Sequence, residues 1–151
     1  MLVRQCAGGV VFLGDKVFLL KNDKGEWVLP KGVIRNGKTA SEVALSRVRY
    51  EGGVSAKIIH SVGETNYEFF SNSRRCPVRN QVKWFLMEAE NANYSVNKIE
   101  DFTDGGFFEI HEALELVTYS QDKALVNLAF KQFQSFLAEV KKIKDVPPVS
   151  K

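Results

Sequence analysis

Two spacings of hydrophobic residues alternate along this chain, one typical of strands and one typical of helices. Residues 3–13 and 17–20 are rich in Val, Phe and Leu, and Gly14-Asp15 separates them. This pattern predicts a β-hairpin. A third strand is predicted at 27–29, where the proline at position 30 ends it.

The first helix is predicted over residues 40–51. Thr39 is suited to cap its N-terminus, and Glu42, three residues later, completes the S/T-x-x-E pattern of a capping box. Gly52-Gly53 ends this helix, because residues without a side chain readily adopt the left-handed conformation found after a helix. The polar segment 32–37, which a glycine bounds at each end, is expected to be a loop.

Strand-forming residues return after this helix. β-branched and aromatic residues predict three strands, at 57–60, 65–70 and 81–88. A polar loop at 71–80 separates the last two, and a short strand at 106–110 leads into a helical turn at 111–116. Apolar residues then recur at helical spacing over 122–141, which predicts an amphipathic helix. That apolar stripe could bind a partner, although packing on the protein's own sheet produces the same pattern.

The order of these elements predicts a layered α+β domain. A chain of 151 residues has the size of one domain, which we expect to cover residues 1–144, followed by a flexible tail at 145–151. No apolar run approaches the ~20 residues that a bilayer span needs, so we expect no membrane partner. Glycines and an aspartate interrupt the first apolar stretch, where a secretory signal would need continuity. A cytoplasmic protein is therefore expected.

Cysteine content and charge narrow the possible partners. Cys6 and Cys76 are the two cysteines, which provide neither a disulfide framework nor a metal-binding spacing. A net charge of +3 is too small to indicate a nucleic acid or an anionic membrane as partner. Four basic residues do cluster around the loop predicted at 71–80, and they could contact phosphates or RNA, although a solvated loop is the simpler interpretation. These residues are Arg74, Arg75, Arg79 and Lys83.

The segment from Leu29 to Val54 reads LPKGVIRNGKTASEVALSRVRYEGGV and resembles the Nudix family. The box of that family is Gx5Ex7REUxEExGU, where U is a bulky aliphatic residue. Gly32 and Gly53 stand at the separation that the box requires, and Val48 occupies one of its aliphatic positions, as does Val54.

Three stretches outside the box resemble the diadenosine polyphosphate hydrolase branch, a MutT-like branch of the family. They are Ala-Gly-Gly-Val-Val from Ala7, Trp-Val-Leu-Pro-Lys-Gly from Trp27, and Trp84-Phe85-Leu86. The resemblance covers residues 3–140. It implies a Nudix-type α/β/α sandwich, in which a mixed β-sheet lies between the box helix and a C-terminal helix.

The charged positions of the box have mostly changed. Lys38 stands at the position of the first Glu, and Ser46 stands at the position of the Arg. Arg47 and Tyr50 replace two further acids, so Glu51 is the one box carboxylate that this chain retains. The spacing of the box is therefore intact while its acidic chemistry is largely absent.

Positions 47, 50 and 51 lie on one helix face, since they are spaced i, i+3 and i+4. Three carboxylates there would bind a hard cation such as Mg²⁺, which bridges phosphate oxygens and activates a water. In the Nudix family such metals promote attack of water on a diphosphate. One carboxylate beside one guanidinium is a poor site for Mg²⁺, because the cation would face a fixed positive charge.

Two interpretations of this face remain open. Arg47 and Glu51 could form an ordinary i,i+4 ion pair worth about 0.2 to 0.5 kcal/mol on a helix that keeps its packing and has lost its function. Alternatively, the guanidinium could take the place of the metal and bind phosphate oxygens as a bidentate fork. The predicted phosphate-binding residues are Lys31, Arg35, Lys38 and Arg47.

The resemblance thus predicts a protein that binds a nucleoside diphosphate-linked or dinucleoside polyphosphate ligand, with weak or no hydrolysis. Tyr67 is a candidate for stacking on the base. The first alternative is an active pyrophosphohydrolase dependent on Mg²⁺ or Mn²⁺, with Glu51 as catalytic metal ligand. A loop carboxylate would then have to assist, drawn from Glu88, Glu90, Glu100, Asp101 and Asp104.

The second alternative is a non-catalytic interaction scaffold. The sequence leaves the base, the number of phosphates and the oligomeric state open.

Overall fold

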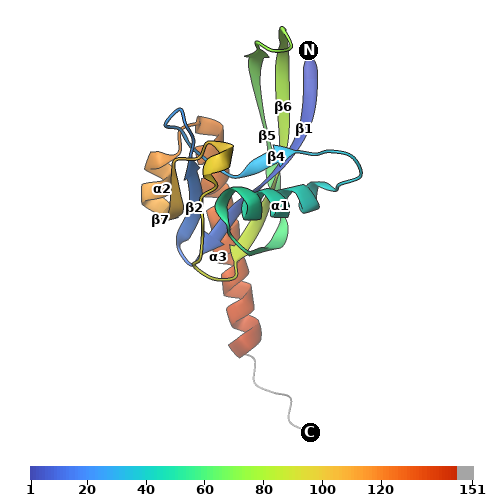
Figure 1. The fold of residues 1–151 in the computed structure, drawn as a ribbon. Coiled ribbons are helices and arrows are strands. Elements are labelled where there is room, and N and C mark those ends of the chain that lie inside the picture. The colour runs from blue at the N-terminus through green and yellow to red at the C-terminus, as the bar shows by residue number, and fades with distance from the viewer. Residues whose placement is uncertain (146–151) are drawn as a thin grey trace.

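The computed structural model describes the backbone of residues 1–145, and all but residue 145 of the predicted tail 145–151 lies outside the described residues. Along the chain the elements are β1 (Leu2–Leu13), β2 (Lys16–Lys21), β3 (Trp27–Val28), β4 (Lys31–Val33), α1 (Ala40–Gly52), β5 (Ala56–Ser71), β6 (Cys76–Ala89), the 3-10 helix η1 (Lys98–Glu100), β7 (Asp104–Glu109), α2 (Ile110–Leu116) and α3 (Ser120–Asp145) (Figure 1).

The strands form one mixed sheet in the order β3-β2-β1-β6-β5. β1 pairs with β6 in parallel, whereas β4 pairs with β1 and β7 pairs with β2, both antiparallel. β1 lies in the middle because its apolar run, residues 6 to 12, is buried on both faces. This central strand therefore connects the core on one side of the sheet to the core on the other.

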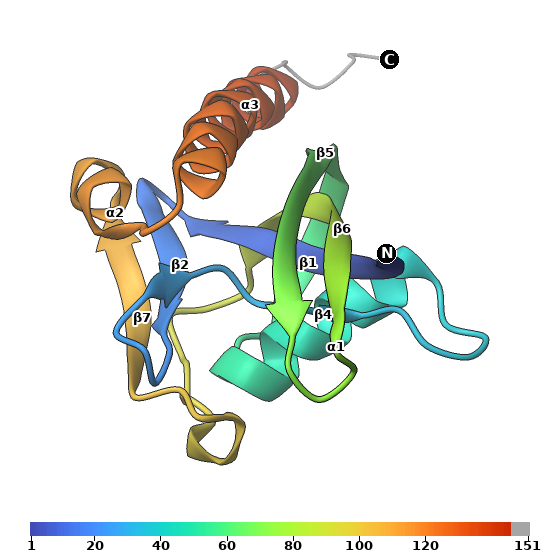
Figure 2. The same ribbon diagram turned by 90° about the horizontal axis from the view of Figure 1, so that it is seen from above.

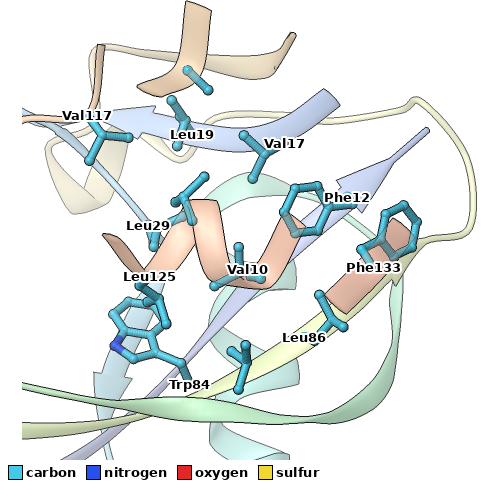
Figure 3. Packing of buried hydrophobic residues seen from close by; sticks show 14 of the residues in the cluster. Val10, Phe12, Val17, Leu19, Leu29, Trp84, Leu86, Val117, Leu125 and Phe133 are labelled. Carbon is cyan, nitrogen blue, oxygen red and sulfur yellow. The ribbon is translucent and has the colours of Figure 1, made fainter. Parts of the chain in front are cut away.

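Successive residues of β1 point to opposite faces and build two separate cores. Val10 and Phe12 pack with residues of α2 and α3, including Phe133, whose ring stacks on Phe12 with a centroid distance of 5.1 Å (Figure 3). Val11 instead packs with Val48 of α1. Figure 2 shows α1 and α3 on opposite sides of the sheet, so the predicted α/β/α sandwich is confirmed. Among the described residues, no helix combines the length and apolar character needed to cross a membrane.

The helix α1 begins and ends where its sequence signals predict. The Thr39 hydroxyl accepts a hydrogen bond of 3.2 Å from the backbone N–H of Glu42. Gly53 adopts the left-handed conformation at φ 64° and donates its N–H to the carbonyl of Arg49. These local bonds satisfy backbone groups that a helix terminus leaves unpaired, so the helix's own sequence contributes to both of its ends.

Two of the strand predictions are wrong. The strands expected at 57–60 and 65–70 form one strand, β5, which pairs with β6 along its length and absorbs register shifts between Ile58 and His60 and between Ser61 and Gly63. The loop expected at 71–80 is shorter, because β6 begins at Cys76. The loop expected at 32–37 begins within β4, whose pairing with β1 is a long-range contact that local sequence does not encode.

Candidate functional site

The last turns of α1 face β4 and the loop that contains η1. Glu51 is 5% exposed, and its Oε1 accepts a hydrogen bond of 3.2 Å from the backbone N–H of Lys31 in β4. The next residue of β4, Gly32, has no side chain, and a Cβ there would lie 2.6 Å from Cδ of Arg47. The glycine thereby allows the arginine to lie directly across the strand.

Arg47 bridges two carboxylates from different parts of the chain. Its Nη2 lies 2.5 Å from Oε2 of Glu51 and 3.6 Å from Oε2 of Glu100. Its guanidinium carbon also lies 5.1 Å from the centroid of the Tyr50 ring, within the range of a cation–π contact. Its Nε is buried and has no hydrogen-bond partner among the described residues. One positive charge therefore holds two negative charges together.

The loop before β7 brings Glu100 to this position by capping the C-terminus of α1. The backbone N–H groups of Ser95 and Asn97 donate to the carbonyls of Gly52 and Glu51 at 2.8 and 2.9 Å. The Asn97 side chain donates to the carbonyl of Tyr50 at 3.0 Å. These bonds satisfy helix-terminal carbonyls that have no partner within the helix, and they fix the loop beside the site.

Glu100 is then held by a second contact, since the Tyr50 hydroxyl donates to its Oε1 at 3.1 Å. The sequence offered Glu100 as one of five loop carboxylates without selecting among them. Residue spacing could not have identified Glu100, because its position depends on hydrogen bonds between its loop and the distant C-terminus of α1.

Burial raises the pKa of the Glu51 carboxyl, and the Arg47 guanidinium and the Lys31 N–H oppose that rise. A carboxylate removed from water is destabilised unless a partner compensates its charge. The negative charge of Glu51 therefore depends on Arg47.

Three of the four predicted phosphate-binding residues, Arg35, Lys38 and Arg47, line one hollow of about 540 Å³ beside α1. Glu42 and Glu100 also line it, and the Lys38 ammonium lies 4.0 Å from the Glu42 carboxylate. That pair is exposed on both sides, so it contributes little binding energy. The hollow thus offers two cations that a ligand can engage, beside the guanidinium that bridges the two carboxylates.

Lys31 lies on the other face of β4, because neighbouring residues of a strand point in opposite directions. Its ammonium lies 5.2 Å from the centroid of the Tyr67 ring in β5. Burial lowers the pKa of Lys31, but Tyr67, Asp122 and Glu51 together outweigh that effect and the pKa is raised. The structure therefore brings Lys31 together with Tyr67 and separates it from Arg35, Lys38 and Arg47.

Three residues beside Lys31 and Tyr67 were missed by the sequence reasoning. Burial raises the pKa of Asp122, at the start of α3, and the charge of Lys31 opposes the rise. The Tyr119 hydroxyl donates a hydrogen bond to the Glu26 carboxylate. This bond raises the pKa of Tyr119 to about 12 and lowers the pKa of Glu26. These residues are far apart in sequence, so no local signal could have found the group.

A divalent cation does not fit the donors that this site offers. Within the described part of the chain, no group of three or more His, Cys, Asp or Glu residues is placed to hold a metal ion. The two carboxylates that approach each other, Glu51 and Glu100, share the guanidinium of Arg47 instead. The guanidinium of Arg47 therefore occupies the centre of this site, between the two carboxylates.

Comparisons with known proteins agree with this fold. The family model of the NUDIX domain matches residues 3–128. The putative mutator protein MutT4 of Mycobacterium tuberculosis (strain CDC 1551 / Oshkosh) is 28% identical over 103 residues, which are 68% of this chain and 40% of that protein. The chain therefore spans about two fifths of the length of that curated relative.

Two solved structures illustrate the similarity of fold. An Ap4A hydrolase of C. elegans, in a binary complex, aligns with a TM-score of 0.67 at 18% identity, covering 90% of this chain and 98% of that chain. An ADP-ribose pyrophosphatase of Streptococcus suis 89-1591 aligns with a TM-score of 0.66 at 16% identity, covering 85% of this chain and 90% of that chain. At these identities the likeness concerns the fold alone.

Proposed function

The chain belongs to the Nudix family, and from that premise we propose that it binds a nucleoside diphosphate-linked or dinucleoside polyphosphate ligand and hydrolyses it weakly or not at all. The ligand class is suggested by the names of its structural neighbours, an Ap4A hydrolase and an ADP-ribose pyrophosphatase. The single observation that carries the proposal is the contact of 2.5 Å between Arg47 and Glu51.

This contact opposes metal-dependent hydrolysis. Nudix hydrolases generally use divalent metal ions, and in this chain the retained box carboxylate is already bound by a guanidinium. A divalent ion about 4 Å from that guanidinium would meet a gross repulsion of about 8 kcal/mol at an effective dielectric constant of about 20.

The same contact leaves phosphate binding possible. Arg35 and Lys38 line the hollow beside Arg47, and guanidinium groups bind phosphate oxygens in bidentate fashion. Glu51 acts here as a positioning residue, because it holds Arg47 against β4. These cations would bind and orient a diphosphate without activating a water.

Lys31 and Tyr67 support a second part of the ligand site, on the opposite face of β4. The ammonium lies beside the half-buried ring, so a base could approach the ring while a phosphate approaches the ammonium. β4 is three residues long and pairs with β1 alone in the described sheet, so its other edge is unpaired. A ligand that passes this edge to reach both faces must be longer than one diphosphate, which favours a dinucleoside polyphosphate.

The experiment is titration calorimetry with diadenosine tetraphosphate, with and without EDTA. We expect the affinity to survive EDTA and to fall at least tenfold in Arg47→Glu. The matched control is Arg49→Glu, which makes the same charge change at an exposed position of the same helix and is expected to retain the affinity. Binding that EDTA abolishes, or equal losses in the two variants, would contradict the proposal.

A second candidate function is an active hydrolase, and one observation favours it. Glu100 lies beside the same guanidinium as Glu51, so two carboxylates would face each other if Arg47 moved away. Removal of Arg47, followed by measurement of Mn²⁺ binding, tests this candidate directly.

A further inference from the structure

The outer ends of three strands extend beyond the helices. We define this part as the ribbon: residues 2–5 of β1, 66–71 of β5, 76–81 of β6, and the turn 72–75 that joins β5 to β6. Figure 1 shows it rising from the body beside the N-terminus. α3 starts near its base, where the Gln121 side chain bonds to the backbone N–H and carbonyl of Asn66 at 3.2 and 2.8 Å. From there α3 runs away from the ribbon, so the outer rows of this sheet face are not covered by that helix.

Two aromatic residues follow each other on the α3 side of the ribbon. Tyr67 and Phe69 are two positions apart in β5, so their side chains share one face and lie about 7 Å apart along the strand. Each ring lies beside a cation from a strand that does not pair directly with β5, since β6 separates β5 from β1 and β1 pairs with β4. Lys31 lies 5.2 Å from the centroid of Tyr67, and Arg4 lies 5.4 Å from the centroid of Phe69. Ring and cation thus repeat along the face.

Phe69 is 40% exposed, although it lies opposite Val78, which is buried. This partly exposed ring lies at the end of the sheet, so it does not contribute to either hydrophobic core. An exposed ring beside a positive charge is the arrangement on which nucleic acid bases stack in proteins that bind single strands.

The charge of the ribbon is also unbalanced. Arg79 is neutralised by Glu68 at 2.7 Å. Arg4, Arg74 and Arg75 make no ion pair within the described residues, and the last two lie exposed in the turn between β5 and β6. Three cations without an ion-pair partner among the described residues therefore lie on the ribbon, although the net charge of the whole chain is only +3. A polyanion complements such a surface.

We propose that the ribbon binds single-stranded nucleic acid, with a terminal nucleotide at Lys31 and Tyr67, the following base on Phe69, and the backbone phosphates near Arg74 and Arg75. The placement of the terminal nucleotide rests on the proposed function. The contacts with Phe69 and the two arginines of the turn rest on the ribbon alone. The inference thus extends the ligand from a small nucleotide to the end of a strand.

The test is fluorescence anisotropy of a labelled ten-nucleotide oligoadenylate RNA, titrated with the full chain at 50 mM NaCl. Phe69→Ser is expected to weaken binding about tenfold, as loss of one stacked base does. The matched control is Phe70→Ser, since Phe70 is the next residue, is 61% exposed and points to the opposite face of the strand. Its affinity is expected to stay within about twofold of the original.

Two further variants separate loss of the contact from loss of the fold. Phe69→Tyr keeps a ring and is expected to keep the affinity within about twofold. The double change Arg74→Gln with Arg75→Gln is expected to reduce the slope of log affinity against log salt by about 1.4, since each phosphate contact on a single strand contributes about 0.7.

The outcomes distinguish this inference from the proposed function. The inference is overturned if the oligonucleotide does not bind at 50 mM NaCl, or if Phe69→Ser and Phe70→Ser weaken it equally. It is also overturned if the affected surface proves to join two copies of this chain, seen as a loss of self-association in Phe69→Ser by sedimentation. If the oligonucleotide binds as expected but diadenosine tetraphosphate does not, the ribbon assignment stands and the proposed function fails.

Discussion

Nη2 of Arg47 lies 2.5 Å from Oε2 of Glu51, one helical turn further along α1. Exposed pairs at this spacing contribute only about 0.2 to 0.5 kcal/mol. This pair differs because the Glu51 side chain is buried and also accepts a hydrogen bond from the backbone of β4. Removal of one partner from a buried pair leaves an uncompensated charge, which typically costs about 3 to 5 kcal/mol. The pair therefore connects the helix to the sheet.

Replacement of Arg47 by Gln should lower the free energy of unfolding by about 3 kcal/mol at pH 8. Loss of the guanidinium leaves Lys31 alone to oppose the effect of burial, so the pKa of Glu51 should rise further above its usual value. When the pKa of a carboxyl is higher in the folded than in the unfolded protein, its contribution to the free energy of unfolding is fully present below the unfolded pKa. That contribution is lost as pH rises through the folded pKa. The loss in Arg47→Gln should therefore be small near pH 4.

Urea denaturation of both proteins at pH 4 and pH 8 measures this difference. Arg49→Gln, on the exposed side of the same helix, is expected to change stability by less than about 0.5 kcal/mol at either pH. An equal loss in Arg47→Gln at both pH values would show that the charge of Glu51 does not depend on Arg47.

Removal of the arginine should also open a site for a cation. In Arg47→Ser the carboxylates of Glu51 and Glu100 would face each other without their shared guanidinium, and paired carboxylates bind hard divalent ions. Electron paramagnetic resonance should detect bound Mn²⁺ in Arg47→Ser and not in the original protein. The further change Glu100→Gln should abolish it. Equal Mn²⁺ binding by the original protein would favour the active hydrolase.

Gly32→Ala should displace Arg47, because the new Cβ would lie 2.6 Å from Cδ of that side chain. Overpacking of this kind typically costs about 1 to 3 kcal/mol. A double-mutant cycle with Arg47→Gln should show a combined loss smaller than the sum of the two single losses, since both changes break the same contact. If the two losses in the free energy of unfolding were additive, the strain in Gly32→Ala would not act through Arg47.

Tyr119→Phe should remove the hydrogen bond to Glu26 and cost at most about 1 kcal/mol at pH 7, because this contact is exposed to solvent. The pKa of Glu26 is lowered in the folded protein. Its contribution is therefore present above the unfolded pKa and is lost as pH falls through the folded pKa. Thermal melts at pH 7 and pH 3 should show a smaller loss at pH 3 than at pH 7. Tyr94→Phe, whose hydroxyl makes no hydrogen bond among the described residues, is the control.

Local signals predicted α1 and its caps because Thr39, Glu42 and Gly53 act within a few residues of the positions they stabilise. The same reasoning divided β5 in two, because Gly63 and its polar neighbours resemble a turn. Pairing with β6 keeps them extended, and bulges absorb the irregularity. A strand stabilised by a distant partner is not encoded by its own propensity.

The site was predicted in part for the same reason. Box spacing correctly paired Arg47 with Glu51, since both lie on one helix. The same spacing placed Lys31 in one group with the other cations. In the structure, the Lys31 side chain lies on the opposite face of β4, beside Tyr67, because neighbouring residues of a strand point in opposite directions. Glu100 depends on a helix cap made by a distant loop, and the contact of Tyr119 with Glu26 spans most of the chain. Such contacts follow from tertiary packing alone.

The most direct test of the central claim, that Arg47 replaces the metal, is phosphate release from nucleoside diphosphates, nucleoside triphosphates and diadenosine polyphosphates with Mg²⁺ or Mn²⁺. Glu51→Gln serves as the control for turnover that depends on the box carboxylate. We predict no release above this control, together with diadenosine tetraphosphate binding that EDTA does not reduce. Metal-dependent release by the original protein that disappears in Glu51→Gln would contradict the account.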